Sequence, residues 1–244
     1  QRQMCIRDRL NSEKSIPTNY KIFERRDTSY QHFINKFCQV STENEISLDE
    51  EIKIFGKSTD QYILTRDIFS NFDFANKKLK PAFFNIADVK VPYEASRLQY
   101  LQKANSGTID VSKFPKIYWD SPMDVAIRMI NLILDRNIKY VINENENNKS
   151  LDELIIKHFE FLKNNYENKG NVVGNHYFVE LVATLLFLKN YSFKEIDLEI
   201  DKVIKEIESE IISQFNSDFT NFEGSTHYTA LMIEALLLLS LIHI

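Results

Sequence analysis

The second half of the chain consists of helix-length apolar segments separated by short polar connections. Each segment repeats apolar residues at helical spacing and begins near a residue that favours a first helical turn, such as Pro122. Short connections force neighbouring helices to run antiparallel. We therefore expect five successive antiparallel helices, over residues 121–140, 151–166, 174–188, 193–215 and 225–238.

The composition favours helices over a many-stranded sheet. The chain has 244 residues but only five Gly and five Pro, so it holds few of the residues that tight turns need. The helical segments differ in length and show no fixed repeat, which disfavours a regular solenoid. We expect a mainly α fold in which antiparallel helical hairpins form a bundle or an α/α toroid.

The first part of the chain gives weaker signals. Residues 10–90 are interpreted as an irregular region with some helix, including a helix over 29–38. Residues 51–56 could form a short strand or an extended arm. A further helix is expected over 92–104, because Pro92 suits the first helical turn.

Both ends of the chain differ in character from the rest. Residues 1–9 and 239–244 resemble translated adapter DNA, so we expect them to be artefactual tails on a fragment of a longer protein. The start shows no apolar signal core, which a truncated start would not show in any case. The apolar run over 235–244 is too short to span a bilayer.

Charge and metal-ligand content exclude further classes of function. There are 30 basic and 35 acidic residues, a net charge of −5, which argues against a dedicated nucleic-acid binder. The five His and two Cys show no zinc-site spacing, so we expect no metal site in this chain.

Three of the expected helices should begin on one rim of the domain. In an antiparallel series the first, third and fifth helices run the same way, so their N-termini lie together. Helix N-termini carry partial positive charge and favour an anionic ligand. Several side chains near these starts could bind a sugar or transfer a proton: Trp119, Asn175, His176, Tyr177, Glu223, His227 and Tyr228.

Each of these residues also has a structural interpretation. Asn175 is a good helix N-cap. His176 is by default a surface residue, and Trp119 is more often part of a core. Tyr228 could pack under the preceding loop, and Glu223 could be a solvated acid.

Four blocks of this sequence resemble the N-terminal helical, alginate lyase-like domain of the heparinase II/III-like polysaccharide lyases. They are VPYEASRLQYL (91–101), WDSPMDVAIRMINLIL (119–134), GNHYFVELVATLLFL (174–188) and NFEGSTHYTALMIEALL (221–237), in the family's order. The resemblance implies an incomplete α/α toroid over 91–238. In complete members a β-sandwich domain follows, which we expect to be missing here.

The resemblance also implies a reaction. The family cleaves acidic, uronic acid-containing polysaccharides by β-elimination in the cleft between the two domains. By resemblance, Asn175 and His176 face the uronate carboxylate, and Tyr228 gives its proton to the departing glycosidic oxygen. The residue after this Tyr is commonly His in the family but is Thr229 here.

The remaining expected site residues are those that would bind the sugar chain. They are Trp119, Arg97, Tyr177, Glu223 and His227. Arg97 could pair with a substrate carboxylate or sulfate, or it could form a structural ion pair with Glu94 or Asp120.

The resemblance also implies functional groups that lie outside this chain. A further His and, in several members, a zinc ion belong to the β-sandwich, so we expect no cofactor here and no activity of this chain alone. The parent would be a bacterial lyase, periplasmic or secreted. Two alternatives stay open: a non-catalytic glycan-binding or surface-polysaccharide assembly protein of the same fold, and a helical protein-interaction scaffold.

Overall fold

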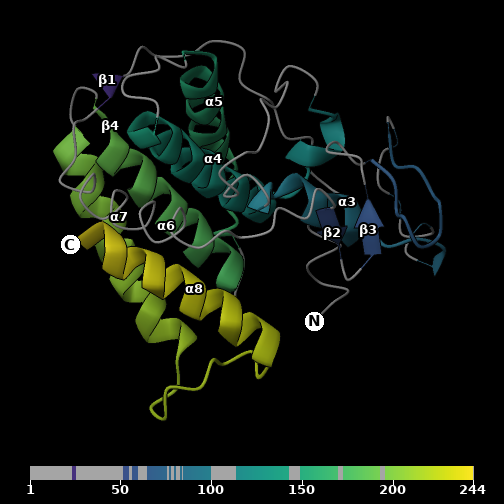
Figure 1. Ribbon diagram of the computed structural model, residues 1–244. Helices are drawn as coiled ribbons and strands as arrows, with labels where there is room; N and C mark the ends of the chain where they lie inside the picture. Colours follow the sequence, from purple (N-terminus) through teal and green to yellow (C-terminus); the bar gives the residue numbers. More distant parts are fainter. Residues whose placement is uncertain are drawn as a thin grey trace.

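The computed structural model describes the helical second half of the chain and parts of the first. The described residues are 24–25, 52–54, 57–59, 65–75, 77, 80, 83, 85–99, 114–142, 149–169, 173–192 and 196–243. Within these ranges the protein is mainly helical, as predicted (Figure 1). The helix expected over 29–38 lies outside them.

All five helices expected in the second half are present. Their bounds are α4 Pro122–Ile142, α5 Lys149–Asn165, α6 Asn175–Asn190, α7 Ile196–Gln214 and α8 Thr226–His243. Pro122 is the first residue of α4, and Asp124 lies in its first turn, near the positive end of the helix dipole. The last helix continues beyond residue 238, where we expected the natural sequence to end.

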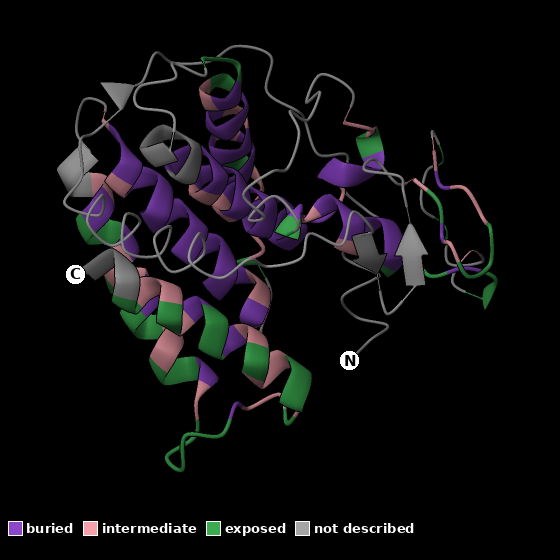
Figure 2. Ribbon diagram, viewed as in Figure 1, coloured by how far each residue is buried: buried purple, intermediate pink, exposed green. Residues whose placement is uncertain are grey.

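Helix α6 forms the centre of the helical layer. It packs mainly against α4, α7 and α8 and also contacts α5. Figure 2 shows it buried along most of its length. The ring of Phe187 stacks between Phe159 of α5, at a centroid distance of 3.9 Å, and Tyr191, at 4.7 Å. Apolar burial of this extent is the main source of stability for the helices.

A fully buried arginine ties the first half of the domain to α4. The guanidinium of Arg128 donates to the carbonyl oxygens of Ser96, at 3.1 Å, and Tyr118, at 2.7 Å. Ser96 is the last residue of α3 (Lys90–Ser96), and Tyr118 lies in the 3-10 helix η4 (Lys116–Trp119). Burial lowers the pKa of Arg128 to about 10, so the side chain remains protonated at neutral pH.

The third partner of Arg128 is a buried, neutral histidine. The Arg128 Nε donates to His158 Nε2 at 2.8 Å, and His158 Nδ1 lies 2.8 Å from the Leu154 carbonyl oxygen. Burial and the nearby Arg128 charge hold the pKa of His158 well below its ordinary value. The neutral ring can therefore accept at Nε2 while it donates at Nδ1.

The helix expected over 92–104 is shorter than predicted. α3 begins at Lys90 and ends at Ser96, and Leu98 has a positive φ of 58°. That backbone conformation breaks a right-handed helix. Leu98 is fully buried, so the core holds the chain in this turn, and the prediction was wrong from residue 97 to the end of the described range at 99.

The described strands form two short antiparallel pairs. β1 (Glu24–Arg25) pairs with β4 (Tyr191–Ser192), directly after α6. β2 (Ile52–Ile54) pairs with β3 (Lys57–Thr59), so the strand interpretation of residues 51–56 is confirmed for its central residues. No helix in the described ranges has both the length and the apolar character that crossing a membrane requires.

Candidate functional site

One carboxylate joins the start of α6 to the loop before α8. The Oε1 atom of Glu223 accepts hydrogen bonds from the Asn175 Nδ2, at 2.8 Å, and from the Asn175 backbone N–H, at 3.3 Å. α6 and α8 pack side by side and run in the same direction (Figure 1). Asn175 is the first residue of α6 and Tyr228 lies in the first turn of α8, so both lie at the same end of the domain.

The loop that carries Glu223 is held in place by its own hydrogen bonds. The buried Asn221 donates to the Gln214 carbonyl oxygen at 3.2 Å and accepts from the Glu223 N–H at 3.0 Å. Gly224 follows with a positive φ of 62°, which glycine adopts without strain. The carboxylate of Glu223 is thus presented to α6 by an ordered turn.

Asn175 does not cap its own helix, so that interpretation was wrong. Gly174 occupies the N-cap position and Asn175 is the first helical residue. The Asn175 side chain is 2 % exposed and donates to Glu223. The anionic Glu223 takes the capping role instead, because a carboxylate is stabilised at the positive end of the helix dipole.

His176 is paired with a carboxylate from the segment after α5. Its Nδ1 contacts the Oε2 atom of Glu167, and both side chains are about one-fifth exposed. An ionised carboxylate can only accept, so the proton of this contact belongs to Nδ1. The Glu167 N–H in turn donates to the fully buried Glu180 at 2.9 Å. His176 is therefore an oriented side chain rather than a mobile surface one.

Tyr177 and Trp119 lie in the core, which corrects their assignment as sugar-binding faces. Tyr177 is 6 % exposed, its hydroxyl donates to Glu206 of α7, and its ring packs edge-on against Tyr166. Burial and the Glu206 carboxylate raise the pKa of Tyr177. Trp119 is 3 % exposed and packs against His158 and Phe161.

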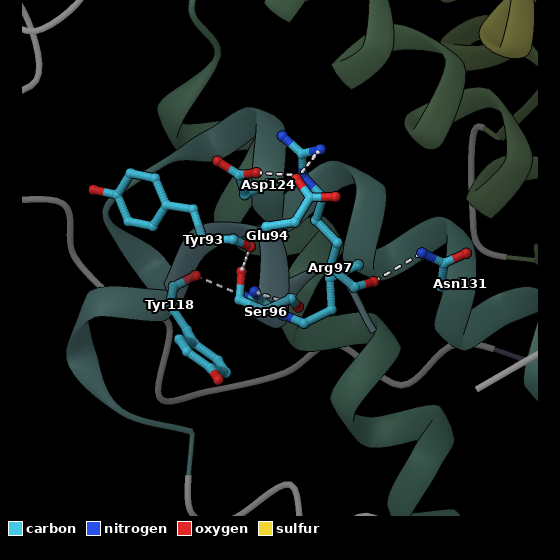
Figure 3. Close-up of polar contacts among 8 residues, drawn as sticks. Tyr93, Glu94, Ser96, Arg97, Tyr118, Asp124 and Asn131 are labelled. Atoms are coloured by element: carbon cyan, nitrogen blue, oxygen red, sulfur yellow. Dashed lines mark hydrogen bonds and ion pairs between the residues drawn. The ribbon is translucent and has the colours of Figure 1, made fainter. Parts of the chain in front are cut away.

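Arg97 is held by two carboxylates (Figure 3). Its Nε donates to Asp124 at 2.7 Å, and a second guanidinium nitrogen lies 2.6 Å from Glu94. Burial opposes the charge of Arg97, but the two carboxylates outweigh it and raise the pKa of Arg97. The structural ion-pair interpretation thus describes this residue, with Asp124 in the place we expected for Asp120.

Glu94 of α3 lies close enough to charged residues of α8 to interact with them electrostatically. Burial raises the pKa of Glu94, and the charges of His227 and Glu234 on α8 are close enough to contribute to its shift. Asp124, in the first turn of α4, contributes as well.

The two candidates on α8, His227 and Tyr228, are both accessible to solvent. His227 is exposed, Tyr228 is half-buried, and their ring centroids are 6.0 Å apart. The Tyr228 N–H donates to Ser225 Oγ at 3.4 Å, so Ser225 caps α8. Thr229 donates its hydroxyl to the Ser225 carbonyl oxygen at 2.9 Å.

An apolar groove lies between α7 and α8, beside the loop that joins them. It has a volume of about 510 Å³. Its lining includes Ile211, Ile212, Phe215, Phe219, Ile233 and Leu236. Sequence reasoning did not predict this groove, although the all-apolar pattern of the last helix was a signal that could have indicated it.

The carboxylates that hold the candidates were also missed, except for Glu223 and Glu94. Glu167, Glu206 and Asp124 lie 9 to 29 residues from the side chains they bind. No local spacing marks such pairs. In the described part of the chain, no group of three or more His, Cys, Asp or Glu residues is placed to hold a metal ion.

Comparisons of the chain with family models, with curated proteins and with solved structures find no match. The resemblance to the heparinase II/III-like lyases therefore depends on the four sequence blocks.

Proposed function

We propose that this chain is the helical half of a polysaccharide lyase that acts on a uronic acid-containing polysaccharide, with its helices arranged as an incomplete α/α toroid. The contact between Asn175 and Glu223 is the observation that carries the proposal. It joins the third and fourth of the sequence blocks that resemble the lyases. His176 and Tyr228 consequently lie on the same end of the domain.

The proposed reaction needs a base to take up the proton that is removed, a group to stabilise charge and a group to donate a proton. By the resemblance, the base is Tyr228 itself or the further His of the β-sandwich domain. The proton removed lies α to the uronate carboxylate and is weakly acidic, so the developing enolate must be stabilised by hydrogen-bond donors. When protonated, His176 can donate through Nε2 while Nδ1 stays with Glu167. Tyr228 can protonate the glycosidic oxygen as its bond to the ring carbon breaks.

The geometry modifies the expected roles. Asn175 is buried and its amide donates to Glu223, so it supports the start of α6 and is not assigned a contact with the ligand. Arg97, Trp119 and Tyr177 are engaged within the protein. We therefore assign ligand contact to His176, Tyr228 and the exposed His227.

The test is a binding and cleavage assay with alginate, polygalacturonate, heparan sulfate and hyaluronan, with a neutral glucan as control. We expect this chain to bind at least one uronate polymer and to release no unsaturated uronate, because the resemblance places a further His on the β-sandwich domain. Equal binding of the neutral glucan, or no binding of any uronate polymer, would show the proposal to be wrong. Ultraviolet absorbance from new double bonds with this chain alone would contradict the two-domain mechanism.

Catalysis is tested in a polypeptide that also carries the β-sandwich domain. Tyr228→Phe should reduce turnover by ~10²-fold or more, the usual scale for general acid–base catalysis. Its folding stability should change by about 1 kcal/mol or less. Wild-type turnover in this variant would show that Tyr228 is not the proton donor. The non-catalytic glycan-binding alternative would then remain, and the burial of Asn175 favours it.

A second candidate function is a helical protein-interaction scaffold, which the apolar groove between α7 and α8 favours. A scaffold gives no preference for uronate polymers over neutral glucan. The same binding assay therefore separates the two functions.

A further inference from the structure

We infer that Glu223 is a positioning residue: its carboxylate locks the start of α8 to the start of α6 and so holds Tyr228 in register with His176. The inference deepens the proposed function and depends on it only for the ligand-binding measurement described below. It replaces the expectation that Glu223 binds substrate directly.

The first argument is the number of bonds that end on one atom. Glu223 Oε1 accepts both the side-chain and the backbone N–H of Asn175, at 2.8 Å and 3.3 Å. Hydrogen bonds to an ionised acceptor are stronger than neutral ones, and the dipole of α6 adds to the attraction. A side chain used in this way has little freedom to turn toward a ligand.

The second argument is that the backbone of Glu223 is also held in place. The Glu223 N–H is held by Asn221, which is buried and bonded to the last residue of α7, Gln214. Tyr228 follows five residues after Glu223, and its N–H is capped by Ser225. Only a short, ordered segment links Glu223 to the first turn of α8. Fixing the carboxylate therefore also fixes the position of that turn.

The third argument comes from burial. Asn175 is 2 % exposed, so its amide needs an internal partner, and Glu223 supplies one. Removing the carboxylate leaves a buried donor unsatisfied and frees the two helix starts from each other. Replacing it with glutamine keeps an oxygen acceptor of the same reach.

The test compares three variants of the chain. Glu223→Ala removes the acceptor, and Glu223→Gln keeps it without the charge. Asn190→Ala is the matched control, because Asn190 is also buried and its side chain accepts from Asn137 of α4 at 2.9 Å, but at the opposite end of α6. Each variant is first checked for cooperative unfolding.

The first readout is amide hydrogen exchange and needs no ligand. In Glu223→Ala the first turns of α6 and α8 should exchange faster together, by about tenfold, the scale set by loss of a bond to a charged acceptor. Glu223→Gln should stay within about threefold of wild type. Asn190→Ala should speed exchange only at the far end of α6. Unchanged exchange at the start of α8 in Glu223→Ala would overturn the inference.

The second readout is affinity for whichever uronate polymer the wild-type chain binds. Glu223→Ala should bind about tenfold more weakly, Glu223→Gln close to wild type, and Asn190→Ala like wild type despite its loss of stability. If Glu223→Gln binds as poorly as Glu223→Ala, the carboxylate touches the ligand itself and the positioning role is wrong. If the wild-type chain binds no uronate polymer, the proposed function fails, and hydrogen exchange alone decides the inference.

Discussion

α6 and α8 are both apolar on all sides, but the fold encloses only one of them. In α6 nearly every residue is buried, including one glutamate and two asparagines. In α8 the buried residues Met232 and Ala235 are close in sequence to Ile233, which is 48 % exposed, and Leu237, which is 60 % exposed. Figure 2 shows the contrast along the two helices.

The difference arises from the neighbours that each helix has. α6 is surrounded by α4, α5, α7 and α8, whereas the main packing partner of α8 is α6. An apolar residue therefore contributes to stability on every face of α6, but in α8 only on the face toward α6. An all-apolar pattern therefore predicts that a helix can be buried. It does not predict which of its faces other helices cover.

The largest expected effect is at the centre of α6. Phe187→Ala removes a ring that stacks against both Phe159 and Tyr191. Loss of such a side chain from a closed core costs about 3–5 kcal/mol of unfolding free energy. Urea unfolding of the two proteins measures this cost. A loss below about 1 kcal/mol would show that the α6 environment is not close-packed.

The next effect distinguishes the two faces of α8. Met232→Ala should cost about 2–3 kcal/mol, because this side chain is fully buried. Leu237→Ala should cost about 0.5 kcal/mol or less, because most of that side chain already contacts water. The matched pair is compared by urea unfolding at one pH. Equal losses would mean that both faces of α8 are covered in solution.

A smaller effect on the unfolding free energy depends on pH and comes from the buried His158. The pKa of His158 is lowered in the folded state, so the unfolded chain binds an extra proton once the pH falls below about 6.5. Stability is therefore fully present above that value and decreases as the pH falls toward the folded-state pKa, by about 1.4 kcal/mol per pH unit. Unfolding curves at a series of pH values give the slope.

The control for this slope is His158→Gln, which cannot take up the proton. Its own stability is lower because Arg128 loses part of its hydrogen bonding. Its dependence on pH between about 6.5 and 5.5 should be weaker than that of wild type by about the same 1.4 kcal/mol per unit. An identical slope would assign the pH dependence to other groups.

The smallest expected effect on stability is at the exposed face of α8. Leu237→Gln should change the unfolding free energy by a few tenths of a kcal/mol. It should also reduce self-association at high concentration, because it interrupts the exposed apolar surface beside the groove of α7 and α8. Light scattering at matched concentrations measures this, and unchanged scattering would show that the face does not mediate association.

Much of the helical architecture was determined by the sequence alone. The apolar periodicity located all five helices of the second half, and Pro122 marked the start of α4. The antiparallel order then predicted that α6 and α8 begin at one end, which the contact between Asn175 and Glu223 confirms. These features are predictable because helix formation depends on residues three and four positions apart.

The tertiary structure decided the rest. It ended α3 at Ser96, where the buried Leu98 turns the backbone, and it moved Trp119 and Tyr177 into the core. It also supplied three candidates with carboxylates that no local spacing indicates: Glu167 for His176, Glu206 for Tyr177 and Asp124 for Arg97.

Asn175 shows the physical reason most clearly. Its sequence context is that of an N-cap, but its amide satisfies a carboxylate 48 residues away. A cap is a local choice that neighbouring residues reveal. Which buried donor meets which acceptor depends on how the helices pack, and only the folded chain determines that.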